Sequence, residues 1–400
     1  MKSPGILLVF TLAMMLTAFS CNDQHPCTVS EDTIALTNAV LIDGTGSEPA
    51  SETTILIQGS QITHVGPGSN IAVPANATTI DLDGAIVLPG FINAHIHRGF
   101  NESNLQAWAR AGVTTVRDVG ANPNQPLFSM RDDFAASDHN ARLVCAGPMI
   151  TVPNGYPIVP WGSSTALTIE SIEEVHQEIG GLLNEGADLI KIALERGDIF
   201  GQDIPTLSVE LAEEIVETVH DRGTIVSAHI LVTRDLELAL EAGVDDIAHM
   251  AADHVPDNLI HRMVDDDIYW VPTLELWHAV GNGLGEIAID NLRRFVQAGG
   301  NVALGTDYAG YSTPFELGMP TREIGWMGDA GMTPMQIIIA ATRNAAVVCN
   351  LGDELGTVEA GKTADLLVVN SNPLEGIEEA LTDIRMVFHN GAVIFSTDDR

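Results

Sequence analysis

The chain has 400 residues, a length that suits two domains or one large barrel with an appendage. Its 18 Lys and Arg residues stand against 54 Asp and Glu residues, so the formal net charge is −36. This charge excludes a general nucleic-acid-binding protein and binding to an anionic membrane surface, because both need a basic surface. Hydrophobic residues make up 45% of the chain, which is enough for a substantial core and excludes a disordered acidic polymer.

Residues 1–20 have the pattern of a signal peptide for export. Lys2 supplies positive charge, and the apolar run 6–18 is too short to span a membrane comfortably. The sequence around Cys21, AFSC, is similar to a bacterial lipoprotein cleavage site, although Phe19 is bulkier than that pattern favours. We therefore predict export to the periplasm, with two alternatives for the mature N-terminus. Either Cys21 carries a lipid that anchors the protein at the bacterial envelope, or ordinary signal cleavage occurs nearby.

Both ends of the remaining chain contain short β-type segments separated by Gly and Pro. A polar linker, residues 21–31, precedes the first of them. The predicted strands are 35–41, 54–58, 61–65 and 79–81 at one end, and 365–369, 385–389 and 392–395 at the other. We predict that residues 32–90 and 353–400 together form one small β-sandwich domain built from both termini.

The middle of the chain, residues 91–352, alternates apolar strands with helical patterns. Helix starts are marked by Ser208, by Thr333 and by Ser171, which forms a capping box with Glu174. The predicted strands are 91–95, 114–118, 142–145, 189–192, 225–229, 246–249, 269–272 and 302–306. Short buried strands joined by helical crossovers predict an α/β fold, a parallel (β/α)8 TIM-like barrel. An open doubly wound sheet is the alternative, weakened because no GxGxxG motif follows the early strands.

Metal-ligand and acid–base side chains cluster near the C-terminal ends of these strands, where barrel enzymes build their sites. They are His95, His97, Lys191, His229, His249 and Asp307. Because side chains alternate along a strand, His95 and His97 lie on one face and can bind one ion together. Taken singly, each residue has an ordinary explanation. An HxH pair is often incidental, a strand-end histidine is usually a hydrogen-bonded core residue, and an aspartate after a strand is often a helix N-cap.

Lys191 is harder to explain, because it lies in an apolar strand. Burying an unpaired ammonium group is costly, and this chain otherwise has lysine only at Lys2 and Lys362. A buried lysine can lose its proton, and the neutral amine can then add carbon dioxide. The resulting carbamate is an anionic oxygen donor that can bridge two divalent cations. The whole set of strand-end residues is therefore a more specific signal than any one member.

The order HxH, Lys, His, His and Asp on successive strands resembles the amidohydrolase superfamily of metal-dependent hydrolases. By its motifs, the chain is most similar to the imidazolonepropionase/prolidase-like branch. These motifs are LPGFINAHIH at 88–97, GVTTVRD at 112–118, GADLIKI at 186–192, LGTD at 304–307, ATRNAA at 341–346 and GTVEAGKTADL at 356–366. The resemblance extends over nearly the whole chain after the signal peptide.

The resemblance implies a binuclear metal centre. One ion would be held by His95, His97 and Asp307 and the other by His229 and His249, with carboxylated Lys191 and a hydroxide as bridges. Two zinc ions are expected from the imidazole-rich ligand set, with manganese, iron and cobalt as alternatives. The metal-activated hydroxide would attack the substrate carbonyl, and Asp307 would carry the proton to the leaving nitrogen.

The implied reaction is hydrolysis of a C–N bond in a small amide, such as a dipeptide, an N-acyl amino acid or a cyclic amide. Three alternatives stay open. The same metal site could act on an ester, lactone or phosphotriester, or the chain could be a non-catalytic binding protein with the same fold. A mononuclear deaminase is the third, disfavoured by the presence of Lys191. The expected partner is a small-molecule substrate, and a homo-oligomer is compatible with the sequence.

Two residues outside the ligand set are candidates for binding the substrate. Tyr156, in a loop after the third barrel strand, could donate to the substrate carbonyl or simply pack within its turn. Arg117, at the end of the second barrel strand, could bind a carboxylate or form a structural ion pair with a neighbouring acid. Prolidase-like relatives often have an aromatic residue or histidine shortly after the residue that corresponds to His229. Leu231 occupies this stretch here, which argues against dipeptidase specificity.

Overall fold

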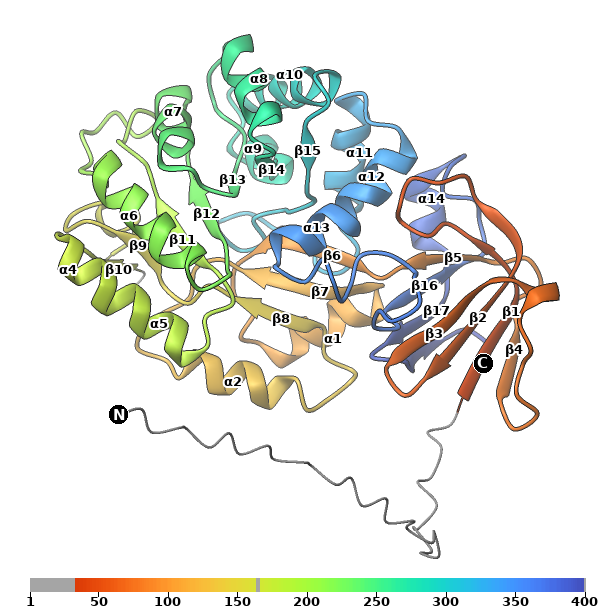
Figure 1. Ribbon diagram of the computed structural model, residues 1–400. Helices are drawn as coiled ribbons and strands as arrows, with labels where there is room; N and C mark the ends of the chain where they lie inside the picture. The colour runs from red at the N-terminus through yellow and green to blue at the C-terminus, as the bar shows by residue number, and fades with distance from the viewer. Residues whose placement is uncertain (1–32, 163–165, 399–400) are drawn as a thin grey trace, which may run out of the picture. The chain divides into compact units, whose positions relative to one another are not determined.

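The computed structural model describes residues 33–162 and 166–398. The predicted signal peptide, linker and lipid attachment at Cys21 lie outside the described residues and stay predictions. Within the described ranges, no helix is long and apolar enough to cross a membrane. These ranges form one sheet from the two ends of the chain and two parallel sheets from its middle (Figure 1).

The terminal sheet combines strands from both ends of the chain in the order β18-β17-β16-β5-β1-β2-β3, with β4 paired to β1. Its strands are β1 (Thr33–Leu41), β2 (Ala50–Gln58), β3 (Gln61–Pro67), β4 (Thr78–Asp81), β5 (Ile86–Pro89), β16 (Leu366–Val369), β17 (Ile384–His389) and β18 (Ala392–Ser396). The sequence predicted all of these except β5. All four residues of β5 are buried, so it lacks the alternation that marks a half-exposed strand. β5 joins the two ends, because it pairs with β1 on one side and β16 on the other.

The middle of the chain forms two parallel sheets, ordered β10-β9-β11-β12-β13-β14-β15 and β6-β7-β8. Their strands are β6 (Phe91–Ile96), β7 (Val113–Asp118), β8 (Arg142–Cys145), β9 (Met149–Thr151), β10 (Ala166–Thr168), β11 (Ile190–Ala193), β12 (Val226–His229), β13 (Asp246–Ala248), β14 (Tyr269–Val271) and β15 (Asn301–Val302). The predicted α/β fold with parallel strands is confirmed, and the arrangement fits a TIM-like fold. Strands β9 and β10 were not predicted.

Backbone hydrogen bonds connect the two parallel sheets at both edges. The Asp188 N–H, just before β11, donates to the Cys145 carbonyl in β8 at 3.0 Å. At the other edge, the Ala94 N–H in β6 donates to the Leu304 carbonyl, after β15, at 2.8 Å. The strand β15 is shorter than predicted, because the Leu304 N–H donates to Ala340 at the end of a helix and not to a strand.

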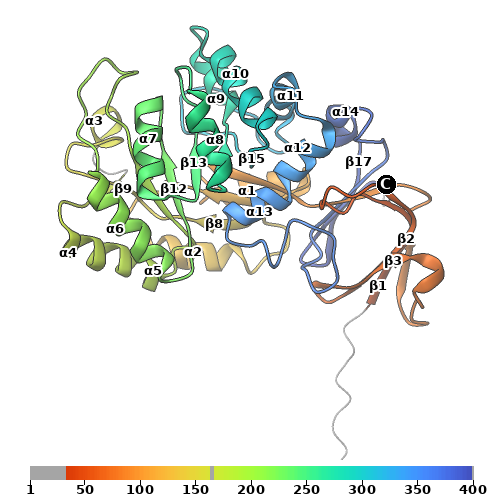
Figure 2. The same ribbon diagram turned by 45° about the horizontal axis from the view of Figure 1, so that its top comes forward.

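Helices lie around the parallel strands in both views of the molecule (Figures 1 and 2). They are α1 (Glu102–Arg110), α2 (Leu127–Phe134), α3 (Ile158–Trp161), α4 (Ile172–Glu174), α5 (Gly180–Glu185), α6 (Val209–His220), α7 (Thr233–Ala242), α8 (Asp257–Asp265), α9 (Leu274–Val280), α10 (Leu284–Gln297), α11 (Thr321–Asp329), α12 (Pro334–Ala341) and α13 (Arg343–Val348). A further helix, α14 (Ile377–Thr382), lies near the terminal sheet (Figure 1).

The helix starts largely follow the predicted caps. The Ser208 side chain caps α6, and Thr333 begins α12 with a complete capping box. Ser171 also accepts from the Glu174 N–H at the start of α4. The Glu174 carboxylate, however, accepts from the N–H of Glu170, one residue earlier than a capping box requires. Local sequence therefore defines where these helices begin.

One ion pair links β8 to the terminal sheet. Arg142 donates to the carboxylate of Asp365 at 2.8 Å, and the Asn390 N–H donates to the same carboxylate at 2.8 Å. Asp365 is buried. Burial by itself would raise the pKa of Asp365, but Arg142, His389 and the Asn390 N–H together hold this pKa below its usual value. The pair therefore stabilises the folded chain in its charged form.

We predict that Asp365→Asn lowers the free energy of unfolding by about 2–3 kcal/mol at pH 7, because Arg142 loses its counter-charge. A carboxyl group with a lowered folded-state pKa stabilises fully above its unfolded-state pKa of about 4. This contribution disappears as the pH falls through the folded-state pKa, so urea unfolding of the two proteins should converge in acid. The control Asp132→Asn breaks an exposed pair with Arg131 and should cost less than about 1 kcal/mol. Equal stabilities of wild type and Asp365→Asn at pH 7 would contradict the stabilising role of the Arg142–Asp365 ion pair.

Candidate active site

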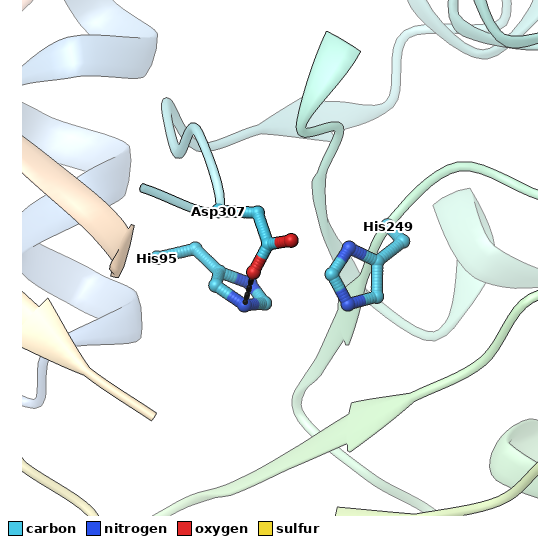
Figure 3. A group of neighbouring side chains, drawn as sticks. All are labelled: His95, His249 and Asp307. Carbon is cyan, nitrogen blue, oxygen red and sulfur yellow. Dashed lines mark ion pairs between the residues drawn. The ribbon is translucent and has the colours of Figure 1, made fainter. Parts of the chain in front are cut away.

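Three side chains from separate strand ends lie together: His95, His249 and Asp307 (Figure 3). His95 lies in β6, His249 directly follows β13, and Asp307 follows β15. Their ligand atoms lie within 4.8 Å of one another, and all three residues are buried. His95 Nε2 and His97 Nε2 each lie 3.2 Å from the same oxygen, Asp307 Oδ1. The two histidines of the HxH pair therefore share one carboxylate.

His229, at the end of β12, lies next to this group. Its ring centroid is 4.7 Å from that of His249, which in turn is 4.7 Å from that of His95. His229 Nε2 and His95 Nδ1 are buried and have no hydrogen-bond partner among the described residues. A buried polar atom without a partner is uncommon and calls for an explanation, such as an ion or water that binds there.

The protonation of these histidines follows from their surroundings. Burial, followed by the charge of Lys191, lowers the pKa of both His95 and His229 well below the usual value. Burial, followed by His229 and Lys191, does the same to the pKa of His249. Burial alone would lower the pKa of His97, but the hydrogen bond and charge of Asp307 raise it. His95, His229 and His249 are therefore neutral at pH 7, the form in which imidazole binds metal ions.

Lys191 lies completely buried in β11. Its Nζ donates to Ser227 Oγ at 3.3 Å, and the Ser227 hydroxyl donates to Asp246 Oδ1 at 2.6 Å. The strand register places the three residues side by side on β11, β12 and β13. Burial lowers the pKa of Lys191 to about 7, so its neutral amine is populated near physiological pH.

Arg117, in β7, belongs to the same network and does not line the cavity. Its guanidinium donates to both oxygens of Asp246, at 2.7 and 3.1 Å, and to the carbonyls of Ala94 and Val348. Arg117 and Asp246 are both completely buried. The structure thus shows the ion pair that the sequence left as an alternative. The other alternative, a contact between Arg117 and a substrate carboxylate, finds no support in this geometry, because the guanidinium is completely buried and its donors are already engaged.

The backbone after the strands adopts conformations that turn side chains inward. Asp307, His249 and Thr273 have φ values of 60°, 70° and 49°. A left-handed conformation costs a non-glycine residue about 1–3 kcal/mol, and such residues concentrate at functional sites. A Cβ at Gly310 would lie 2.1 Å from Asp307 Oδ1. Position 310 therefore has to be glycine for the Asp307 carboxylate to keep its place.

Thr273, two residues after β14, orients His249. Its hydroxyl lies 2.9 Å from His249 Nδ1, which leaves Nε2 as the nitrogen available to a ligand. Glu323 in α11 accepts from the N–H groups of Leu274 and Glu275 at 2.8 and 2.7 Å, and so fixes the start of α9 beside Thr273. Thr273 was not predicted as a site residue from the sequence, although a polar residue directly after a predicted strand was an available signal.

A cavity of 590 Å³ opens onto the ligand side chains. We call the four lining residues next to the ligand group, His97, His229, His249 and Asp307, the floor of the cavity, and its other lining residues the wall. Tyr156 lies in the wall, with its ring 4.3 Å from that of His229 and nearly parallel to it. The structure therefore places Tyr156 at the site, while its hydrogen bond to a substrate stays a prediction. The volume is typical of a small-molecule site.

The sequence profile of the amidohydrolase family matches residues 86–394 of this chain. The chain belongs to the amidohydrolase family. This amidohydrolase is 29% identical to the ochratoxinase of Aspergillus niger, over 85% of this chain and 81% of that protein. It is 24% identical to the imidazolonepropionase of Fusobacterium nucleatum, over 85% of this chain and 91% of that protein. A solved structure of a Xaa-Pro dipeptidase with methionine in its active site is similar at 25% identity and a TM-score of 0.79, covering 90% of this chain and 99% of that one.

The predicted resemblance to amidohydrolases of the imidazolonepropionase/prolidase-like branch is therefore confirmed, and so is the prediction of an amidohydrolase enzyme. The division of ligands between two ions stays a prediction. The observed group places His249 with His95 and Asp307, whereas the predicted division places it with His229. The structure brings the side chains of His95, His229, His249 and Asp307 together.

We predict that Arg117→Met lowers the free energy of unfolding by about 3–5 kcal/mol, because Asp246 then stays buried without a counter-charge. Urea unfolding measures this loss. The matched control is Arg293→Met, which removes an exposed pair with Asp290 and should cost less than about 1 kcal/mol. An Arg117 variant that keeps full stability but loses activity would instead favour a direct contact with substrate.

Proposed function

We propose that this amidohydrolase is a metal-dependent hydrolase that cleaves the C–N bond of an amide in a small molecule. The observation that carries the proposal is the buried group of His95, His249 and Asp307, which lies at the ends of parallel strands. The cavity that opens onto this group has room for a small substrate. Family membership and the names of the relatives, including ochratoxinase and Xaa-Pro dipeptidase, support hydrolysis of a C–N bond.

The side chains at the site fit divalent cations. Neutral imidazoles and a carboxylate are ligands that zinc prefers, and buried nitrogens of His95 and His229 have no partner among the described residues. His249 has its Nδ1 engaged by Thr273, which is the usual arrangement for a metal-binding histidine. We propose two zinc ions, one held by His95, His97 and Asp307 and the other by His229 and His249.

When bound, the two cations would supply a Lewis acid and a hydroxide nucleophile at neutral pH. The chain itself would move the proton. Asp307 Oδ1 lies 3.2 Å from the Nε2 atoms of both His95 and His97, so this carboxylate is at the centre of the site. Asp307 would accept the proton of the nucleophile and deliver it to the leaving nitrogen as the C–N bond breaks.

We also propose that Lys191 is carboxylated and bridges the two cations. Its support is the position of a completely buried amine on β11, next to the strand that carries His229. An ammonium group at this position would repel cations, whereas a carbamate carries the opposite charge. The neutral amine forms a bond to the carbon of carbon dioxide and releases one proton, so the product has a single negative charge.

For the fold, we propose a closed (β/α)8 barrel over residues 91–352, together with a composite β-sandwich domain of residues 32–90 and 353–400. The hydrogen bonds at both edges of the parallel sheets support the barrel. A separate cluster of buried side chains from the terminal strands supports the second domain. We also propose export to the periplasm or the bacterial envelope, supported by Lys2 and the apolar run 6–18.

Protein purified with zinc and carbonate should contain about two zinc ions per chain, as measured by elemental analysis. Chelation should abolish amide hydrolysis and zinc should restore it, because the proposed nucleophile depends on the cations. Less than one ion per chain would contradict the binuclear proposal.

Lys191→Met should keep the fold, because methionine has a similar volume and removes a buried amine. It should lose bound zinc and reduce kcat/KM by about 100-fold or more, since the bridge between the ions is gone. The matched control is Lys362→Gln, which changes a lysine that donates to the carbonyls of Gly352 and Leu355 and should keep both zinc and activity. Full zinc content and activity in Lys191→Met would refute the bridge.

A further inference from the structure

The wall of the cavity above the floor is mainly apolar. It contains Met149, Tyr156, Ile199, Phe200, Leu231, Val232, Ala252, Leu276, Trp277, Val280, Leu284 and Tyr311. Among the described residues that line the cavity, none is lysine or arginine. Besides the hydroxyl groups of Tyr156 and Tyr311, the polar or charged side chains of the wall are those of Asn282 and Asp198, and none of these four carries a positive charge. The wall therefore offers a substrate carboxylate no counter-charge.

The guanidinium group beside this wall is already paired. Arg234 Nε lies 2.6 Å from Asp198 Oδ2, and both side chains are about half exposed, at 49% and 43%. A second guanidinium, that of Arg196, lies 3.4 Å from the buried carboxylate of Asp235. In each of these two pairs, a carboxylate already balances the positive charge of the guanidinium group before a substrate binds.

We propose that the substrate of this site is an uncharged, mainly apolar amide that lacks a carboxylate beside the scissile bond. This inference rests on the proposed function. An ionised carboxylate against this wall would lose its hydration and gain neither a counter-charge nor enough hydrogen-bond donors, which is strongly unfavourable. A carboxylate that moved to the floor instead would occupy the place that the scissile carbonyl needs.

The proposal narrows the set of substrates expected from sequence. Dipeptides and N-acyl amino acids both carry a carboxylate next to the scissile amide, so this site disfavours them. Neutral cyclic amides and amides of apolar amines remain. The rings of His229, Tyr156 and Phe200 follow one another in near-parallel orientation, with interplanar angles of 13° and 18°. This flat wall suits an aromatic group on the substrate.

The test compares N-benzoylleucine with N-benzoylleucinamide. The two compounds have nearly the same shape and the same scissile bond, and both release benzoate, but only the first carries a carboxylate. We expect kcat/KM for the leucinamide to exceed that for the acid by at least about tenfold, which corresponds to about 1.4 kcal/mol. Equal rates, or faster hydrolysis of the acid, would overturn the inference while leaving the proposed function intact.

Binding to the zinc-loaded protein gives a readout that does not depend on hydrolysis. If neither compound is cleaved, the proposed amide hydrolysis fails, and the dissociation constants measured by calorimetry still decide the inference. Tighter binding of the leucinamide would support it. Equal binding, or tighter binding of the acid, would overturn it.

The variant Asp198→Asn tests whether the charge at the cavity wall causes the preference for the leucinamide. It removes one negative charge and leaves Arg234 unpaired beside the cavity, so the preference for the leucinamide should fall several-fold. The matched control, Asp132→Asn, breaks the exposed Arg131–Asp132 pair in α2, away from the cavity, and should leave the preference unchanged. An unchanged preference in Asp198→Asn would contradict the electrostatic explanation.

Discussion

The ion pair between Arg117 and Asp246 is the interaction on which the site depends. It joins β7 to β13 with both side chains completely buried, and Ser227 extends it through hydrogen bonds to Lys191 on β11. Buried charges are tolerated only when their partners are closely arranged, so the network restricts how these strands can shift relative to one another. Asp246 begins β13, and His249 directly follows the last residue of the same three-residue strand. The register that satisfies the charges is therefore the register that assembles the candidate ligands.

The strands and the loops contribute different parts of the site. The strands and the positions directly after them supply the histidines, the lysine and the aspartate, whose positions follow from the sheet. The loops and helix starts that follow supply the cavity wall, including Phe200 and Trp277. Thr273 connects the two parts, because it lies beside the wall helix α9 and bonds to His249. In the proposed function, bond cleavage and the selection of substrate would thus reside on separate segments of one family fold.

The sequence predicted those features of the site that depend on a few neighbouring residues. Strand positions and the HxH spacing were enough to place His95 and His97 at the end of β6 and Lys191 in β11, because alternation along a strand is a property of a few residues. The sequence could not show that Arg117 pairs with Asp246, since 129 residues separate them and several acids were available. β5 and the short strands β9 and β10 were missed because they lack alternation or length. The positive φ of His249 and Asp307 was also hidden, because it results from tertiary packing and not from residue preference.

The terminal sheet has a consequence for the order of folding. β5 lies between β1, near the start of the chain, and β16, near its end, so its pairing is complete only after the last strands have been synthesised. Contacts between such distant segments carry a large loop-closure entropy and slow the folding reaction. Until then, the unpaired backbone N–H and C=O groups along β5 can pair with the strands of other chains, which favours aggregation. Completion of this sheet is thus expected to be a late step in folding, whereas the parallel strands in the middle can begin to pair earlier.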